Sequence, residues 1–357
     1  CGDFHEGKAW VQLKGGKRGY IDPQGNVLFE GDWRKLGDFL HGHAVAMNAE
    51  NDWGIINATG QWVVKPNKKY RKIELLPQPS LAMVYVGTQQ ALLHIATDKL
   101  LTPLYHVIRP FSDGIALVRK NPLSENVLLN SDWGFIDTTG KLLGNFRFDR
   151  LKDFSDGRAP AFDQHLNRWG YINKAGEWAV APAFFVAEPF VDGRAVVQLS
   201  PDRYGLIDTA GAYLMQPLHK KIVDNHQRIC LVRQSYSAFH FISEDLRRLH
   251  AGSFTQAHPF RDGVAPVRVG KLWGIINQQG LFVLSPKYQT MSPFENGYAQ
   301  VGIETRFGVS NTKGEIIIPP VYEYIQYMGG GIFRVENGDT VQYLNVKGEW
   351  VWQSAQR

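Results

Sequence analysis

One eight-residue segment recurs along this 357-residue chain: Trp169-Gly170-Tyr171-Ile172-Asn173-Lys174-Ala175-Gly176. Most copies pair an aromatic residue with glycine, reach Asn or Asp three residues later, and end on a second glycine. The copies lie about 35 residues apart, or roughly twice that, and a fixed period of this size indicates a repeat architecture. Clear copies begin at Trp53-Gly54, Trp133-Gly134 and Trp273-Gly274, and weaker ones at Arg18-Gly19, Tyr204-Gly205 and Phe307-Gly308.

Two further signatures accompany each copy. A Phe-x-x-Gly segment precedes it, often with Asp before the glycine, and Asp-Gly is a turn signal because glycine tolerates positive φ. The Asn/Asp-x-x-Gly end predicts a hairpin turn followed by another apolar strand. Proline is expected to stop several of these strands, since it has no N–H to donate. The aspartates are Asp113, Asp156, Asp192 and Asp262, and the prolines are Pro66, Pro182, Pro217, Pro286 and Pro319.

Each repeat unit, here called a module, is therefore predicted to be a β-meander of three strands or four. Period-two alternation places Trp169 and Tyr171 on one face and Gly170 and Ile172 on the other, and both faces are apolar. An isolated module would lose roughly 50 kcal/mol of conformational entropy, at ~1.5 kcal/mol per residue, so neighbouring modules must cover both faces. We expect the glycine beside the tryptophan to leave room for a ring from the adjacent module.

The modules account for nearly the whole chain. We count ten in a single array over residues 4–357, seven of them clear. The longest insertion lies around Asn121–Asn126, and such loops are typical places for recognition residues. Full modules start near Phe4, Phe39, Phe111, Phe154, Phe190, Phe260 and Phe294, and degenerate ones occupy residues 71–103, 221–249 and 327–357.

These segments resemble the bacterial WG-repeat family, whose unit reads F-x-x-G-x-A-x-V, then W-G-x-I-[ND]-x-x-G, then an apolar strand and P-x-[FY]. The resemblance implies a tandem all-β fold and a frequent surface or envelope location, and it implies no catalytic residues. We expect the meanders to stack as a curved, open solenoid. A closed, propeller-like ring is the alternative, but ten modules exceed the usual four to eight blades.

The first residues, Cys1-Gly2-Asp3, resemble the start of a mature bacterial lipoprotein, in which that cysteine carries the lipid. The resemblance predicts a lipid anchor at Cys1 and a location at the outer membrane, facing the periplasm. Cys230 lies in an apolar run and is expected to be a buried free thiol. The net charge of +5 comes from dispersed basic residues, so we expect no nucleic-acid partner.

Catalytic and metal-binding signals are scarce. The aspartates before the turn glycines are expected to be turn residues rather than a carboxylate cluster. His41 and His43 flank Gly42, but the sequence identifies no further ligand for a metal site. The run Gly329–Gly331 is expected to be a flexible turn between modules rather than a phosphate cradle, because no helix pattern follows it. We expect no cofactor.

The sequence thus predicts a non-catalytic, lipid-anchored envelope protein whose repeat surface acts as a scaffold for a protein partner. One alternative is a carbohydrate- or peptidoglycan-binding module, which would need a row of solvent-facing Trp or Tyr side chains. Another is an enzyme with its active site in a groove of the array, which would need converging titratable groups.

Overall fold

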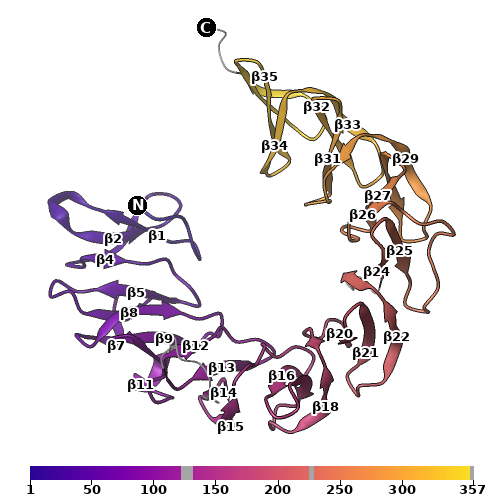
Figure 1. Cartoon of the computed structure of the whole chain (residues 1–357). Coiled ribbons are helices and arrows are strands. Elements are labelled where there is room, and N and C mark those ends of the chain that lie inside the picture. The colour runs from indigo at the N-terminus through magenta and orange to yellow at the C-terminus, as the bar shows by residue number, and fades with distance from the viewer. Residues whose placement is uncertain (122–131, 225–228, 354–357) are drawn as a thin grey trace. The chain divides into compact units, whose positions relative to one another are not determined.

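The computed structural model describes residues 1–121, 132–224 and 229–353. Within these residues the chain forms ten antiparallel sheets and two short 3₁₀ helices, with no α-helix. Each sheet contains three or four strands that are consecutive in the sequence (Figure 1). The prediction of an all-β fold made of tandem antiparallel meanders is confirmed.

The sheets follow one another in chain order. The first five are β1 (Ala9–Gln12), β2 (Arg18–Ile21) and β3 (Val27–Gly31); β4 (Lys35–Leu36), β5 (His43–Met47), β6 (Trp53–Asn57) and β7 (Trp62–Asn67); β8 (Tyr70–Leu75), β9 (Leu81–Val86), β10 (Gln89–His94) and β11 (Lys99–Leu100); β12 (Val107–Ile108), β13 (Ile115–Arg119), β14 (Trp133–Asp137) and β15 (Leu142–Phe148); and β16 (Ala159–Asp163), β17 (Arg168–Ile172) and β18 (Trp178–Phe184). The other five are β19 (Val186–Ala187), β20 (Arg194–Ser200), β21 (Arg203–Asp208) and β22 (Tyr213–His219); β23 (Lys221–Asp224), β24 (Cys230–Ser235) and β25 (Ala238–Ile242); β26 (Gln256–Ala257), β27 (Val264–Val269), β28 (Leu272–Asn277) and β29 (Phe282–Tyr288); β30 (Thr290–Met291), β31 (Tyr298–Ile303), β32 (Arg306–Asn311) and β33 (Ile316–Tyr322); and β34 (Tyr324–Gly329), β35 (Ile332–Asn337), β36 (Thr340–Leu344) and β37 (Trp350–Gln353). The 3₁₀ helices are η1 (Lys14–Gly16) and η2 (Ile95–Thr97).

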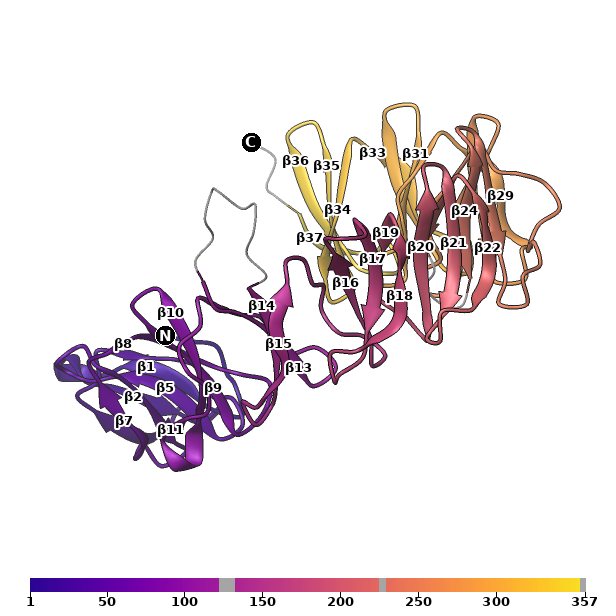
Figure 2. The same ribbon diagram turned by 60° about the horizontal axis from the view of Figure 1, so that its bottom comes forward.

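The sheets belong to two compact units. Unit 1 comprises Cys1–Asn167 with Tyr171–Trp178, and unit 2 comprises Arg168–Gly170 with Ala179–Arg357. Within unit 2, strands of successive sheets lie side by side, for example β22 with β24 and β33 with β35 (Figure 2). Among the described strands, no sheet combines the two ends of the chain, which is the pairing that would mark a closed ring.

The degenerate stretches also carry sheets: β8–β11, β23–β25 and β34–β37. Several sheets begin earlier than the Phe-x-x-Gly segment suggests, because a strand of only two residues precedes it, as β4 and β30 do. The predicted recognition loop around Asn121–Asn126 lies almost entirely outside the described residues.

The Asn/Asp-x-x-Gly turns close hairpins as predicted. In the turn between β6 and β7, the Gly60 N–H donates to the Asn57 carbonyl at 3.0 Å, and Gly60 has a φ of +81°. The Asn57 side chain accepts the N–H groups of Thr59 and Gln61, both at 3.0 Å. Asn or Asp is therefore favoured here because its side chain satisfies turn amides that the strands leave unpaired.

The tryptophan-adjacent glycine faces a β-bulge in its own sheet. Trp273 pairs with Tyr288 while Ile275 pairs with Leu284, so β29 carries two extra residues opposite this point. A Cβ on Gly274 would lie 2.5 Å from the Leu284 carbonyl oxygen and 2.8 Å from the Pro286 nitrogen. The expectation that this glycine accommodates a ring from the adjacent module is wrong, since the bulged backbone occupies the space.

The same bulge explains the prolines. Pro286 lies inside β29 rather than after it, and Pro217 likewise lies inside β22. Proline is tolerated at a bulge in an outer strand because its missing N–H is not needed for pairing there. The expectation that these prolines stop their strands is therefore wrong.

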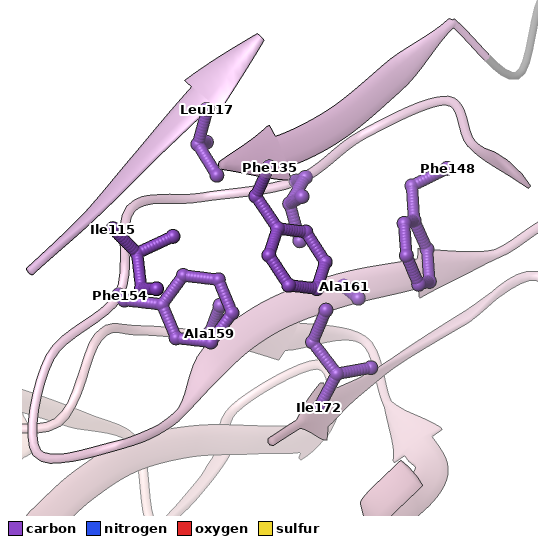
Figure 3. Packing of buried hydrophobic residues seen from close by; sticks show 9 residues of the cluster. Ile115, Leu117, Phe135, Phe148, Phe154, Ala159, Ala161 and Ile172 are labelled. Atoms are coloured by element: carbon purple, nitrogen blue, oxygen red, sulfur yellow. The ribbon is translucent and has the colours of Figure 1, made fainter. Parts of the chain in front are cut away.

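Hydrophobic clusters join consecutive sheets. In unit 1, Phe135 of β14 and Phe154, which precedes β16, pack in one cluster with ring centroids 5.0 Å apart (Figure 3). Tyr171 and Ile172 are neighbours on opposite faces of β17, and both are fully buried. Fully burying a side chain of this size contributes roughly 1.5–3 kcal/mol. Both faces of this sheet are covered, as the alternation predicted.

Candidate functional site

The phenylalanine of the Phe-x-x-Gly segment fills the boundary between two sheets. Phe39 packs on Tyr20 of the preceding sheet with ring centroids 4.7 Å apart, and Phe260 packs on Phe241 at 4.8 Å. Both phenylalanines are almost completely buried. We call a phenylalanine in this position a Phe plug.

The boundary between the sheets β4–β7 and β8–β11 lacks the plug and is open. A groove of about 910 Å³ lies in unit 1 where the sheet β4–β7 meets the sheet β8–β11. The segment joining β8 to β9 has the sequence Leu-Pro-Gln-Pro-Ser and contains no phenylalanine. The side chains that line the groove are mainly apolar and include Leu36, Val45, Trp53, Ile73 and Leu75.

Cations outnumber carboxylates along this groove. Lys35, Arg71 and Lys72 line it together with a single carboxylate, Asp38. The Lys35 ammonium lies 6.0 Å from the Trp53 ring centroid, and Arg71 donates to the Gly87 carbonyl at 3.2 Å. In the part of the chain that the structure describes, neither Lys35 nor Arg71 forms an ion pair.

Lys72 differs from these two cations because it is paired. It contacts the Glu74 carboxylate and lies 5.3 Å from the Tyr85 ring centroid. The Tyr85 hydroxyl donates to Glu74 at 2.6 Å, and burial together with this carboxylate raises the pKa of Tyr85 to about 12. The hydrogen bonds from Lys72 and Tyr85 lower the pKa of Glu74. Lys35 and Arg71 are thus the groove cations available to a bound anion.

A second, smaller groove of about 520 Å³ lies at another sheet boundary, in unit 2. It lies where the sheet β30–β33 meets β34–β37, and its lining includes Phe294, Tyr298, Ile325 and Phe333. Here too the following sheet has no Phe-x-x-Gly segment, because β34 and β35 are joined through Gly330. Both grooves open at boundaries where the plug is missing.

The predicted turn aspartates do lie in turns. Asp113, Asp156, Asp192 and Asp262 all have positive φ of 51–52°, and each glycine that follows also has positive φ. Two successive residues with positive φ define the type I′ hairpin turn that suits the twist of the flanking strands. The aspartates occupy equivalent positions in separate modules.

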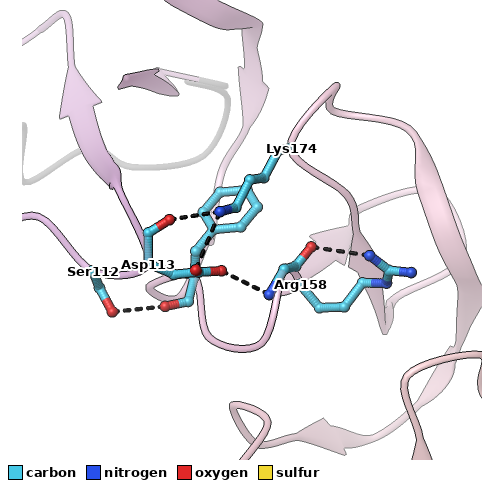
Figure 4. A network of polar contacts seen from close by, with 6 residues as sticks. Ser112, Asp113, Arg158 and Lys174 are labelled. Carbon is cyan, nitrogen blue, oxygen red and sulfur yellow. Dashed lines mark hydrogen bonds and ion pairs between the residues drawn. The ribbon is translucent and has the colours of Figure 1, made fainter. Parts of the chain in front are cut away.

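Some of these carboxylates also join modules, which the sequence did not reveal. Asp113 Oδ2 accepts the N–H of Gly157 in the next Phe-x-x-Gly turn at 2.7 Å, and Lys174 lies 3.1 Å from Asp113 Oδ1 (Figure 4). Asp262 accepts the Gly297 N–H at 2.7 Å in the same way. The signal in the sequence is the acidic residue before the turn glycine, but its partner lies about 35 to 45 residues away.

The two turn histidines bond to backbone carbonyls. His41 Nε2 lies 2.8 Å from the Pro77 carbonyl oxygen, and His43 Nδ1 lies 2.8 Å from that of His41. Among the described residues, no group of three His, Cys, Asp or Glu side chains could hold a metal ion.

The aromatic residues of the repeats lie at the margins of the clusters. Trp53, Trp133, Trp169, Tyr204 and Phe307 are half-buried, and Trp273 is buried. Trp273 belongs to a core cluster, and Trp53, Trp133, Tyr204 and Phe307 pack against core clusters from half-buried positions. The other rings each keep an edge at the surface, and Trp53 contributes its edge to the groove.

The remaining candidate residues lie elsewhere. Cys230 is buried and forms no disulfide, as expected, and Cys1 is exposed. Gly329–Gly331 forms the turn between β34 and β35, so it lies within a sheet rather than between modules as expected. The described part of the chain contains no helix of the length and hydrophobicity needed to cross a bilayer. The lipid anchor at Cys1, the envelope location and the lack of a nucleic-acid partner stay predictions.

The solved structures that are similar to this chain include three at low identity. A structure described as the eukaryotic initiation factor matches 88% of this chain and 96% of its own, with 11% identity and a TM-score of 0.43. BamB from Moraxella catarrhalis matches 88% of this chain and 91% of its own, at 10% identity and a TM-score of 0.32. Apo AztD from Citrobacter koseri matches 89% and 93%, at 13% identity and a TM-score of 0.32. No curated protein matches the sequence significantly.

Seven segments of the chain match one family model, that of the WG containing repeat. They are residues 53–73, 99–121, 133–162, 169–200, 253–273, 273–304 and 307–340, and together they cover more than half of the sequence. Each matched segment contains part of the meander described above. The chain belongs to the WG-repeat family.

Proposed function

We propose that this protein is a non-catalytic binding scaffold, and that the groove between β4–β7 and β8–β11 holds a segment of a protein partner. The observation that carries the proposal is an open apolar groove at a boundary without its Phe plug. Its volume of about 910 Å³ lies within the range typical of ligand sites, ~300–1,000 Å³. The combination of apolar lining and a few polar groups is also typical of such sites.

The groove fits a catalytic role less well than a binding role. His5 and Asp38 lie 3.6 Å apart at its edge, but both side chains are about half exposed. Catalytic acids and bases usually lie in a cleft that shields them from bulk water. These two residues are more consistent with a polar rim.

A photo-crosslinking experiment tests the proposal. A random peptide library is selected against the full chain, and the enriched peptides are added to variants with a benzophenone amino acid in place of Leu40 or Leu28. Both leucines are exposed, but only Leu40 lines the groove. We expect crosslinks at position 40 and not at position 28. Selected peptides that fail to react at position 40 would remove the groove as the binding site.

Carbohydrate binding is a second candidate, supported by a different surface. Trp350 and Trp352 on β37 are both more than half exposed, and alternate residues of a strand share one face. Two such rings could stack on sugar units. Titration with chitin oligosaccharides tests this candidate: we expect saturable binding that Trp352→Ala removes, and no binding to the wild-type chain would rule it out.

A further inference from the structure

We infer that the groove selects a segment in which a phenylalanine stands next to carboxylates. This inference rests on the proposed function and names the chemistry of its partner. It comes from two features of the groove: the position left vacant by the plug, and the unpaired cations beside it.

The first feature is shape, for which the chain supplies its own examples. At other boundaries the occupant is a phenylalanine: Phe39 on Tyr20, and Phe154 on Phe135. At the open boundary, apolar side chains from both sheets line the groove, among them Val45, Trp53 and Leu75. An aromatic side chain from outside the chain therefore fits this position, with volume left for its flanking backbone.

The second feature is charge. Lys35 and Arg71 line the groove without ion-pair partners in the described residues, and Asp38 is the one carboxylate in the lining. Arginine binds carboxylates through charge-assisted hydrogen bonds, and a cation beside an apolar surface attracts an anion most strongly. A basic segment would be repelled and a neutral one would leave both cations unused. An acidic segment matches them.

The two features also occur together inside the chain. Four plug segments carry an aspartate two residues after the phenylalanine. These segments already pack at module boundaries, with the phenylalanine inserted and the carboxylate at the turn. They are Phe111 with Asp113, Phe154 with Asp156, Phe190 with Asp192, and Phe260 with Asp262.

A defined peptide tests the inference. The probe is a fluorescein-labelled peptide of sequence Ser-Asp-Asp-Phe-Asp-Gly-Ser, titrated with the full chain and followed by fluorescence anisotropy. Two altered peptides accompany it, one with Phe replaced by Ala and one with every Asp replaced by Lys. We expect each altered peptide to bind at least ~10-fold more weakly, and added salt to weaken the parent peptide.

A matched pair of double variants tests whether the peptide binds through the groove cations. Lys35→Glu combined with Arg71→Glu reverses the groove cations, whereas Lys68→Glu combined with Lys69→Glu makes the same charge change at exposed residues outside the groove lining. We expect the first pair to lose at least ~10-fold in affinity and the second to change it by less than ~3-fold. Equal losses in both pairs would show a general charge effect and would overturn the inference.

The outcomes separate this inference from the proposed function. If library peptides crosslink at position 40 but are basic or lack aromatic residues, the groove binds partners and the acidic phenylalanine segment is wrong. If the labelled probe binds with full affinity to the chain carrying Lys35→Glu and Arg71→Glu, its site is not this groove.

Discussion

Two boundaries between consecutive sheets differ in whether a Phe plug is present. Where β12–β15 meets β16–β18, Phe154 packs against Phe135 and the boundary is closed (Figure 3). Where β4–β7 meets β8–β11, no plug is present and a groove of about 910 Å³ remains. The boundary without a plug is therefore the one at which we propose that a partner binds.

Removing a plug should have the largest effect on stability. We expect Phe154→Ala to lower the free energy of unfolding by about 3–5 kcal/mol, because a buried ring is lost and a cavity remains. Urea denaturation followed by tryptophan fluorescence measures this change. The matched control is Phe4→Ala, since Phe4 holds the same motif position but is 52% exposed, whereas Phe154 is 1% exposed. Similar costs for the two variants would contradict the plug assignment.

Adding a methyl group at Gly274, opposite the bulge in β29, should have the next largest effect on stability. We expect Gly274→Ala to lower the free energy of unfolding by about 1–3 kcal/mol, because its Cβ would lie 2.5 Å from the Leu284 carbonyl oxygen. The control is Gly252→Ala, whose Cβ would meet no atom closer than 3.6 Å. Thermal unfolding compares the two. A tolerated Gly274→Ala would mean that the bulge can relax and does not dictate glycine.

Removing the contact between Glu6 and the turn at His41 and Gly42 should have the smallest effect on stability. The size of this effect depends on pH. The Glu6 carboxylate accepts the N–H groups of His41 and Gly42 at 2.6 and 2.8 Å, and the Gly42 hydrogen bond is the main cause that lowers the pKa of Glu6. We expect Glu6→Gln to cost about 0.5–1 kcal/mol at neutral pH, a modest value because the carboxylate is well solvated.

The pH dependence of that cost has a definite direction. A lowered pKa in the folded state means that the stabilisation is complete above the ordinary glutamate pKa of ~4.3 and is lost as the pH falls through the lowered pKa. Wild-type and Glu6→Gln stabilities should therefore converge in acid. The control is Glu50→Gln, which changes an exposed carboxylate away from this turn. A constant difference down to the lowest pH would contradict the carboxylate contact.

Much of the fold could be predicted from the sequence because its signals are local. The period of the aromatic-glycine pair predicts the number of sheets, and Asn57-x-x-Gly60 predicts a hairpin with glycine at positive φ. The alternation around Tyr171 and Ile172 predicts that both faces of the sheet are buried. Each of these inferences depends on residues within one module.

The features that could not be predicted depend on contacts between segments that are far apart in the sequence. The bulge opposite Gly274 follows from strand register, which one strand does not encode. The hydrogen bond from Gly157 to Asp113 joins turns 44 residues apart. The groove was the most difficult feature to predict. From the sequence alone, the lack of a phenylalanine in residues 71–103 indicates only a degenerate module. The groove becomes evident only when the packing of the two neighbouring sheets is known.

We infer that the groove takes the place of a missing Phe plug and binds a phenylalanine from a partner. The most direct measurement compares the affinity of the labelled phenylalanine peptide for the wild-type chain and for Leu75→Trp, which fills the groove from within, with Leu28→Trp as an exposed control outside it. We predict at least a ~10-fold loss for Leu75→Trp with unchanged circular dichroism, and no loss for Leu28→Trp. Unchanged affinity in a correctly folded Leu75→Trp chain would contradict the claim.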